Sequence, residues 1–134
     1  PGRAAERSLL LGEARRDLLP RLEPLLDHAA LAAFQAEVPK VRASDALVDY
    51  VLRLVEATRT QPAFALGLSP RGSLALLAAA RAWALLAGRD YVIPEDVQAV
   101  LPAVAGHRLR DQADPTGHGG GALVQWLLRE VPAL

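Results

Sequence analysis

An apolar stretch of alanine and leucine at residues 70–87 restricts the possible folds more than any other feature of this chain. Both residues are strong helix formers. Ser69 and Pro70 suit the N-cap and the first position of a helix, and Gly88 suits its end. Arg81 in the middle of the stretch, together with its short length, argues against a membrane span. Because the predicted helix is apolar on nearly all faces, we expect other helices to surround it in an all-α fold, a small helical bundle.

Arg71 lies in the first turn of this helix, where the macrodipole disfavours a cation by a few tenths to about 1 kcal/mol. A cation in this place indicates a nearby anion, to which the free first-turn amides would also donate. The residues leave a second interpretation open, in which the arginine lies in water or pairs with a carboxylate. Arg71, with the helix start at Ser69 and Pro70, is therefore a candidate phosphate site.

Caps and periodicity predict further helices at residues 4–11, 28–37, 45–58, 94–105 and 122–130, with another turn or two at 13–19. Two extended pieces, at 91–93 and 107–109, bracket one of these helices, so a minor two-stranded ribbon there would embellish the bundle. Apolar spacing in the helices, the Ala/Leu surroundings of Trp83 and two apolar residues in the loop at 60–68 predict a set of inward side chains: Leu31, Phe34, Leu47, Val48, Val51, Leu54, Val55, Phe64, Leu66, Trp83, Val97, Val100, Leu101, Val104, Leu123, Trp126 and Leu127.

Composition excludes several classes of site. The formal net charge is zero, which argues against an electrostatic nucleic-acid binder. The chain has no cysteine, so it has no disulfide and no thiolate metal site. The three histidines, His28, His107 and His118, have no partner at metal-ligand spacing, and we expect no metal site. A polar N-terminus gives no secretory signal, and we expect a cytoplasmic protein without membrane insertion.

The motifs of a self-sufficient ATPase are missing. No G-x-x-x-x-G-K-[ST] loop is present, and the single lysine, Lys40, has no such context. The glycine run at 119–121 lacks the strand, the lysine and the hydroxyl residue that a phosphate loop needs. No hydrophobic strand ends in paired acids that would hold Mg²⁺. We expect no catalytic residue in the isolated chain and no activity of its own.

Residues 67–109 combine several motifs in order: a G-x-SPR-x-S start, an alanine/leucine helix ending in GRDYV, then P-x-DV and HRL. This order resembles the C-terminal helical lid of MoxR-type AAA+ ATPases, the group related to magnesium chelatase. The similarity extends upstream through 41–50 and 55–59 and downstream to 127–132. One departure is Gly72, where the family more often has alanine or a similar small residue.

The resemblance implies that the chain is a single helical lid domain, 1–134, excised from a longer ATPase, as its proline start also suggests. Residues 1–26 would be linker helices from the core and 27–134 the lid bundle. In this family the lid packs over a nucleotide held by a separate α/β domain. Arg71 matches the position called sensor 2, which contacts the γ-phosphate. The motif residues Asp90, Tyr91, Pro94 and Asp96 would serve the turn and the packing.

The same resemblance implies ATP and Mg²⁺ in the intact parent, with neither bound by the isolated chain. Implied partners are the upstream α/β core, neighbouring subunits of a ring oligomer and a von Willebrand factor A-domain protein. The implied work is chaperone-like remodelling or metal-cofactor insertion. Two alternatives stay open: a stand-alone helical protein-interaction module, and a helix-turn-helix DNA binder, which the zero net charge disfavours.

Overall fold

The computed structural model describes residues 2–12, 19–113 and 120–133. These residues divide into two compact units, Pro1–Leu31 and Ala32–Leu134. His118 and most of the turns expected at 13–19 lie outside the described residues. The assignment of 1–26 to linker helices and 27–134 to a lid bundle stays a prediction. None of the helices in the described ranges is long and apolar enough to cross a bilayer.

The first unit contains short helices with exposed side chains. Helix α1 covers Arg3–Leu11, a 3₁₀ turn covers Leu19–Arg21, and α3, His28–Glu37, begins here and ends in the second unit. The start of α3 is capped as predicted, because the Ala30 N–H donates to Asp27 Oδ1 at 2.7 Å. Neither α1 nor α3 contains a buried residue.

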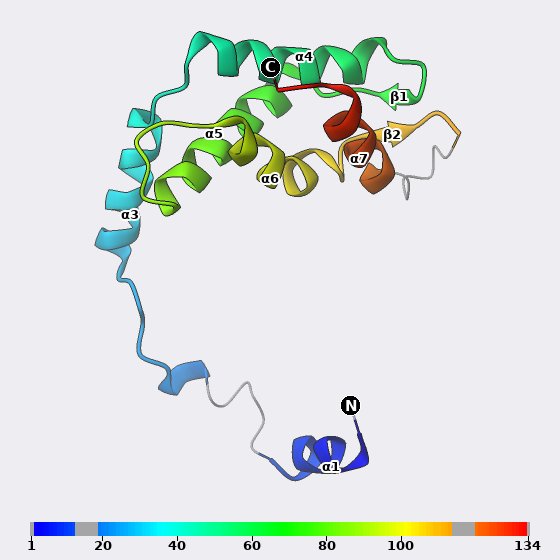
Figure 1. Ribbon diagram of the computed structural model, residues 1–134. Helices are drawn as coiled ribbons and strands as arrows, with labels where there is room; N and C mark the ends of the chain where they lie inside the picture. Colours follow the sequence, from blue (N-terminus) through cyan, green and yellow to red (C-terminus); the bar gives the residue numbers. More distant parts are fainter. Residues whose placement is uncertain (1, 13–18, 114–119, 134) are drawn as a thin grey trace. The chain divides into compact units, whose positions relative to one another are not determined.

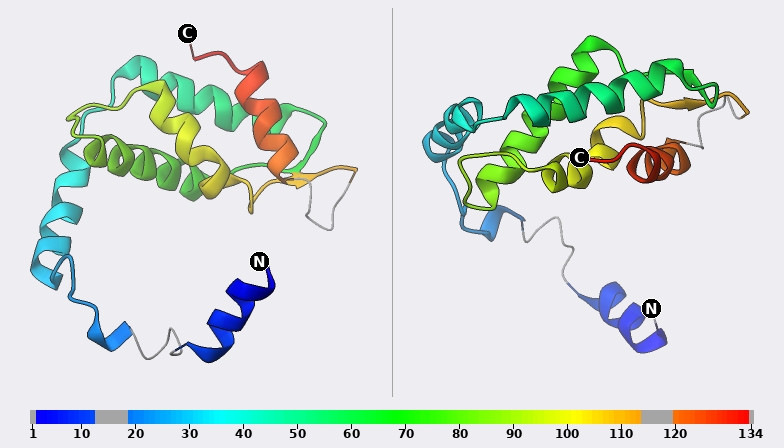
Figure 2. Two further views of the ribbon diagram at one scale, coloured as in Figure 1. Left: turned by 60° about the horizontal axis from the view of Figure 1, so that its bottom comes forward. Right: turned by 45° about the horizontal axis from the view of Figure 1, so that its top comes forward.

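The second unit is the helical bundle that the sequence predicts (Figure 1). Helix α5 packs most extensively against α6, and α7 packs against α6 and α4. In both views of Figure 2 a short strand pair lies beside α7. The elements in chain order are a 3₁₀ turn at Val38–Lys40, α4 Asp45–Thr60, β1 Phe64–Leu66, α5 Pro70–Leu86, α6 Pro94–Ala105, β2 Arg110–Asp111 and α7 Gly120–Glu130.

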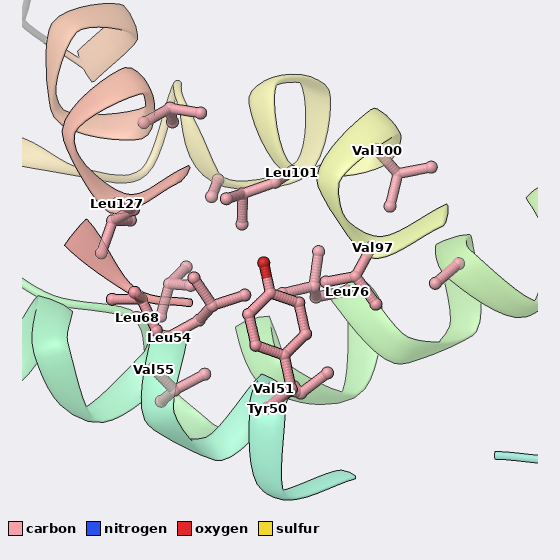
Figure 3. Close-up of a cluster of buried hydrophobic side chains, with 14 of the residues drawn as sticks. Tyr50, Val51, Leu54, Val55, Leu68, Leu76, Val97, Val100, Leu101 and Leu127 are labelled. Atoms are coloured by element: carbon pink, nitrogen blue, oxygen red, sulfur yellow. The ribbon is translucent and has the colours of Figure 1, made fainter. Parts of the chain in front are cut away.

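The core lies between α4, α5, α6 and α7, and Tyr50 is at its centre (Figure 3). The Tyr50 ring is fully buried and its hydroxyl accepts a hydrogen bond from Gln98 Nε2 at 3.3 Å. The apolar stripe predicted on α4 is confirmed, because most of its members are buried and follow the helical repeat. Buried members of the predicted core are Leu47, Val51, Leu54, Val55, Phe64, Val97, Val100, Leu101, Leu123 and Leu127.

Helix α5 buries a narrow face, contrary to the prediction that it is surrounded. Its buried residues recur every fourth position: Gly72, Leu76, Ala80 and Ala84. Three of these four positions are small residues, which allow close packing, and Leu77, Ala79 and Leu85 beside them are only partly buried against the core. Trp83, which we expected in the core, is 50% exposed because it lies one residue off this face.

The small ribbon is formed by residues other than those predicted. Strands β1 and β2 pair antiparallel, with Phe64 opposite Asp111. The expected segment at 91–93 pairs elsewhere: Arg42 N donates to Asp90 O and Val92 N donates to Arg42 O, both at 2.9 Å. The other expected segment, 107–109, is a turn with no strand pairing. The segment before α4 takes the hydrogen bonds that the predicted ribbon would need.

Three other expected core residues are exposed. Leu31 and Phe34 on α3 are 46% and 50% exposed. Alanines around α3 give it no single apolar stripe, so spacing did not define a buried face. Leu66 is 58% exposed although regular alternation along β1 would place it on the same face as the buried Phe64; the pairing with β2 is irregular between these two residues. Phe64 packs edge-on against Trp126, with ring centroids 5.7 Å apart.

Candidate functional site

The start of α5 has the cap that the sequence predicts. Ser69 is extended at the N-cap, its Oγ accepts from Gly72 N at 3.2 Å, and Pro70 occupies the first helical position. The Ser69 carbonyl accepts from Ser73 N at 3.1 Å. In this first turn the Arg71 N–H is the amide that bonds to none of the described residues. An anion here would therefore meet one free amide and the Arg71 guanidinium.

The last turn of α4 fixes the loop that leads into this helix. Thr58 is buried; its Oγ1 donates to Val55 O at 2.6 Å and accepts from Leu68 N at 2.9 Å. Arg59 Nε donates to Leu68 O at 2.8 Å. Gly67 must be glycine, because a Cβ there would lie 2.4 Å from Thr58 O. Both backbone groups of Leu68 are thus held by α4, which sets where α5 begins.

Arg71 itself is exposed and forms no hydrogen bond or ion pair with the described part of the chain. No carboxylate within those ranges pairs with Arg71, so the interpretation in which a carboxylate neutralises this arginine finds no support there. Its backbone is held by the capped first turn, whereas its guanidinium is in solvent. Arg71 is thus a cation with a fixed backbone, and its guanidinium donors form no hydrogen bond within the described ranges.

A second arginine, Arg108, approaches the same helix start, and sequence reasoning gave it no role. A Cβ on Gly72 would lie 3.7 Å from Arg108 Nη1 and 3.1 Å from Leu68 Cδ2. Arg108 Nε donates to His107 Nε2 at 3.1 Å, and His107 Nδ1 lies 3.1 Å from Ala103 O. A side chain at position 72 would therefore crowd Leu68, whereas its contact with the Arg108 guanidinium would be an ordinary one. No spacing rule signals this approach, because the two residues lie 36 positions apart in the chain.

An ion pair, and not only an interaction with the helix dipole, stabilises the turn at the C-terminal end of α5. Gly88 has φ +75°, which ends the helix as predicted. Arg89 donates to both carboxylate oxygens of Asp96, at 2.6 and 2.5 Å, and Ile93 N donates to Asp96 Oδ2 at 2.9 Å. The hydrogen bond from Arg89 lowers the pKa of the buried Asp96 carboxyl. Asp96 thus fixes the α5–α6 turn.

The described ranges contain no group of three or more histidine, cysteine or acidic side chains placed to hold a metal ion. His28 is on α3 and His107 follows α6, so the two histidines that the structure describes come from separate elements.

Comparison with known proteins places the chain in a family. The sequence profile of the AAA lid domain family matches residues 56–125, just over half of the chain. The chain is 41% identical over 110 residues to "Uncharacterized protein YeaC" of Bacillus subtilis, a match covering 82% of this chain and 34% of that protein. It is 43% identical over 99 residues to "Chaperone MoxR1" of Mycobacterium tuberculosis, covering 67% and 26%. The chain spans about a third or less of these relatives.

A solved structure agrees at the level of the fold. A putative ATPase from Cytophaga hutchinsonii superposes with a TM-score of 0.77, covering 98% of this chain and 43% of the other, at 23% sequence identity. "Protein MoxR" of Paracoccus denitrificans is a further relative, 39% identical over 99 residues, which cover 63% of this chain and 29% of that one. The chain belongs to the AAA lid domain family and is a lid domain of the MoxR type.

Proposed function

We propose that this lid closes over ATP bound by an α/β core of the same polypeptide, with Arg71 as sensor 2 on the γ-phosphate. The observation that carries the proposal is the state of Arg71, which is exposed and unpaired within the described ranges. Ser69 and Pro70 support it by forming a capped, rigid helix start. The match to the AAA lid domain family supports a nucleotide as the anion that Arg71 contacts.

The anchoring of the helix start gives the lid a way to respond to nucleotide state. Thr58 and Arg59 hydrogen-bond the loop before Ser69 to α4. Because this loop is fixed, a displacement of Arg71 would move the bundle as well as the loop. A hydrogen bond to a charged group contributes about 1.5–3 kcal/mol. Loss of the γ-phosphate would remove that contribution and let the lid change its angle.

The remaining components of the reaction belong to other parts of the complex. Mg²⁺ and the phosphate loop are assigned to the α/β core, and ATP is the substrate of the whole protein. Neighbouring subunits of a ring and a von Willebrand factor A-domain protein are the proposed partners. The name of the mycobacterial relative, a chaperone, supports chaperone-like remodelling over metal-cofactor insertion as the work performed.

The test is ATP turnover by the complete protein that contains this chain. Arg71→Ala is expected to lower turnover by about 10²-fold, the scale for loss of one transition-state donor. The matched control is Arg129→Ala, because Arg129 is also exposed and its partner is the neighbouring Glu130. Circular dichroism should show both variants folded. Turnover that is equal in the two variants would contradict the role of Arg71.

A helical interaction module is the second candidate, favoured by an apolar groove of about 380 Å³ between α4 and α5. The exposed leucines Leu52 and Leu74 line it, and Val48, Val51, Val55 and Leu77 complete its apolar wall. Size-exclusion chromatography with the purified α/β core separates the two candidates. A lid docks on that core in a manner that depends on the nucleotide, whereas an independent module does not.

A further inference from the structure

A basic hollow of about 670 Å³ lies beside the middle of α5, away from the helix start described above. Its lining consists of residues 39–44, Tyr91, Val92 and Arg81. The charged residues of this lining are Lys40, Arg42 and Arg81, and all three are cations. We call these residues the basic hollow.

Arg81 is the unusual member of the basic hollow. Its Nε is buried and has no hydrogen-bond acceptor, and its guanidinium forms no bond or ion pair with the described ranges. A buried donor without an acceptor is destabilising, because it has lost its hydrogen bonds to water. Arg81 is also the one charged residue between Arg71 and the end of α5. The two Nη groups of Arg81, which are not buried and have no partner in the described ranges, can donate to an acceptor from outside the chain.

The other two cations are held loosely. Lys40 Nζ lies 2.7 Å from Glu37 Oε1, and Arg42 Nη2 lies 3.0 Å from Asp90 Oδ2. The paired side chains are half exposed or more, and an exposed ion pair contributes little to stability. Both cations are therefore free to turn toward a stronger acceptor at small cost. Three cations against these two carboxylates leave one net positive charge.

The walls of the basic hollow are already in place without a ligand. Arg42 exchanges two backbone hydrogen bonds with the segment at 90–92, and Val41 and Val92 on either side are buried. These bonds join the segment before α4 to the turn after α5. A ligand would enter a formed site and would not have to order it, which lowers the cost of binding.

We propose that the basic hollow binds an oxyanion, a carboxylate or phosphate group, with the two Nη groups of Arg81 as the inner donors and Lys40 and Arg42 as the outer cations. The planar guanidinium matches two oxygens of one such group. The site is separate from Arg71, because ten residues of helix place Arg81 about 15 Å farther along the axis. The proposal does not rest on nucleotide sensing, so either can fail alone.

The test follows the Nε–Hε signal of Arg81 by ¹⁵N NMR in the full 134-residue chain. The chain is titrated with sodium phosphate and separately with sodium acetate, and sodium chloride keeps the ionic strength constant. We expect a saturating shift with a dissociation constant on the order of 1 mM. The Nε–Hε signal of exposed Arg129 is the internal reference and should not saturate.

Variants assign the binding to the named residues. Lys40→Ala and Arg42→Ala should each weaken binding at least threefold, and Arg129→Ala should leave it unchanged. Arg81→Gln should abolish the shift, read at the Arg42 backbone amide. Lys40 and Arg42 are exposed, so their variants keep the test valid where Arg81→Gln fails to fold.

Saturation by phosphate alone identifies a phosphate site, and saturation by both anions identifies a general oxyanion site; either result supports the proposal. It is overturned when neither anion gives a saturating shift, or when Arg81 and Arg129 shift equally.

Discussion

Replacing Thr58 by valine tests the anchoring of α5 on α4. The substitution keeps the shape of the side chain and removes one hydroxyl, whose Oγ1 accepts from Leu68 N at 2.9 Å and donates to Val55 O at 2.6 Å. Leu68 and Thr58 are 2% and 1% exposed, so water cannot replace the lost acceptor. A buried N–H left without an acceptor costs about 1–3 kcal/mol. We expect a loss of about 2 kcal/mol in the free energy of unfolding.

The assay is thermal and urea unfolding of the 134-residue chain, followed by circular dichroism. For a unit of this size, about 2 kcal/mol corresponds to a melting temperature roughly 10 °C lower. Thr60→Val is the matched control, because Thr60 Oγ1 donates to Glu56 O at 3.0 Å on the exposed side of the same helix. Its effect should stay within about 0.5 kcal/mol. Equal losses in the two variants would refute the anchoring argument.

Two further predictions concern the turn after α5. Asp96→Asn should destabilise the chain by about 2–3 kcal/mol at pH 7. Because the folded-state pKa of Asp96 is lowered, this contribution is present above the unfolded value of about 3.9 and is lost as pH falls through the folded value. Urea titrations should therefore show that the difference in the free energy of unfolding between wild type and Asp96→Asn becomes smaller below about pH 4. A difference that does not depend on pH would contradict the stabilising role of the ionised Asp96. Gly88→Ala should lower the free energy of unfolding by about 1 kcal/mol in the same assay, because Gly88 has φ +75°. Gly121→Ala is the control and should be neutral, because Gly121 has no such φ and a Cβ there would meet no atom within 4 Å. Equal losses in the two variants would contradict that reasoning.

The helices were predictable because their signals are local. Ser44 and Ser69 accept from amides three residues on, as the capping rule requires, and each begins a helix at the next residue. Pro94 likewise occupies the first position of α6. These determinants lie within four residues of the backbone groups they satisfy, so reading along the chain finds them.

What depends on tertiary contact was not predictable in the same way. Trp83 looked like a core residue by composition, but the small residues Ala80 and Ala84 form the face that packs. The predicted strand pair does not form because Arg42, which lies 48 positions before Asp90, makes the backbone hydrogen bonds of residues 90–92. The approach of Arg108 to Gly72 and the buried Nε of Arg81 have no sequence signature, since neither contact is local.

The measurement that tests the central claim most directly is nucleotide discrimination by the complete protein, with and without Arg71→Ala. Dissociation constants are measured for a non-hydrolysable ATP analogue and for ADP. If Arg71 contacts the γ-phosphate, the variant binds the analogue at least about tenfold more weakly, as expected for a charge-assisted hydrogen bond, and binds ADP as before. Equal weakening for both nucleotides, or no change for either, would contradict the assignment of Arg71 as the residue through which this lid senses ATP.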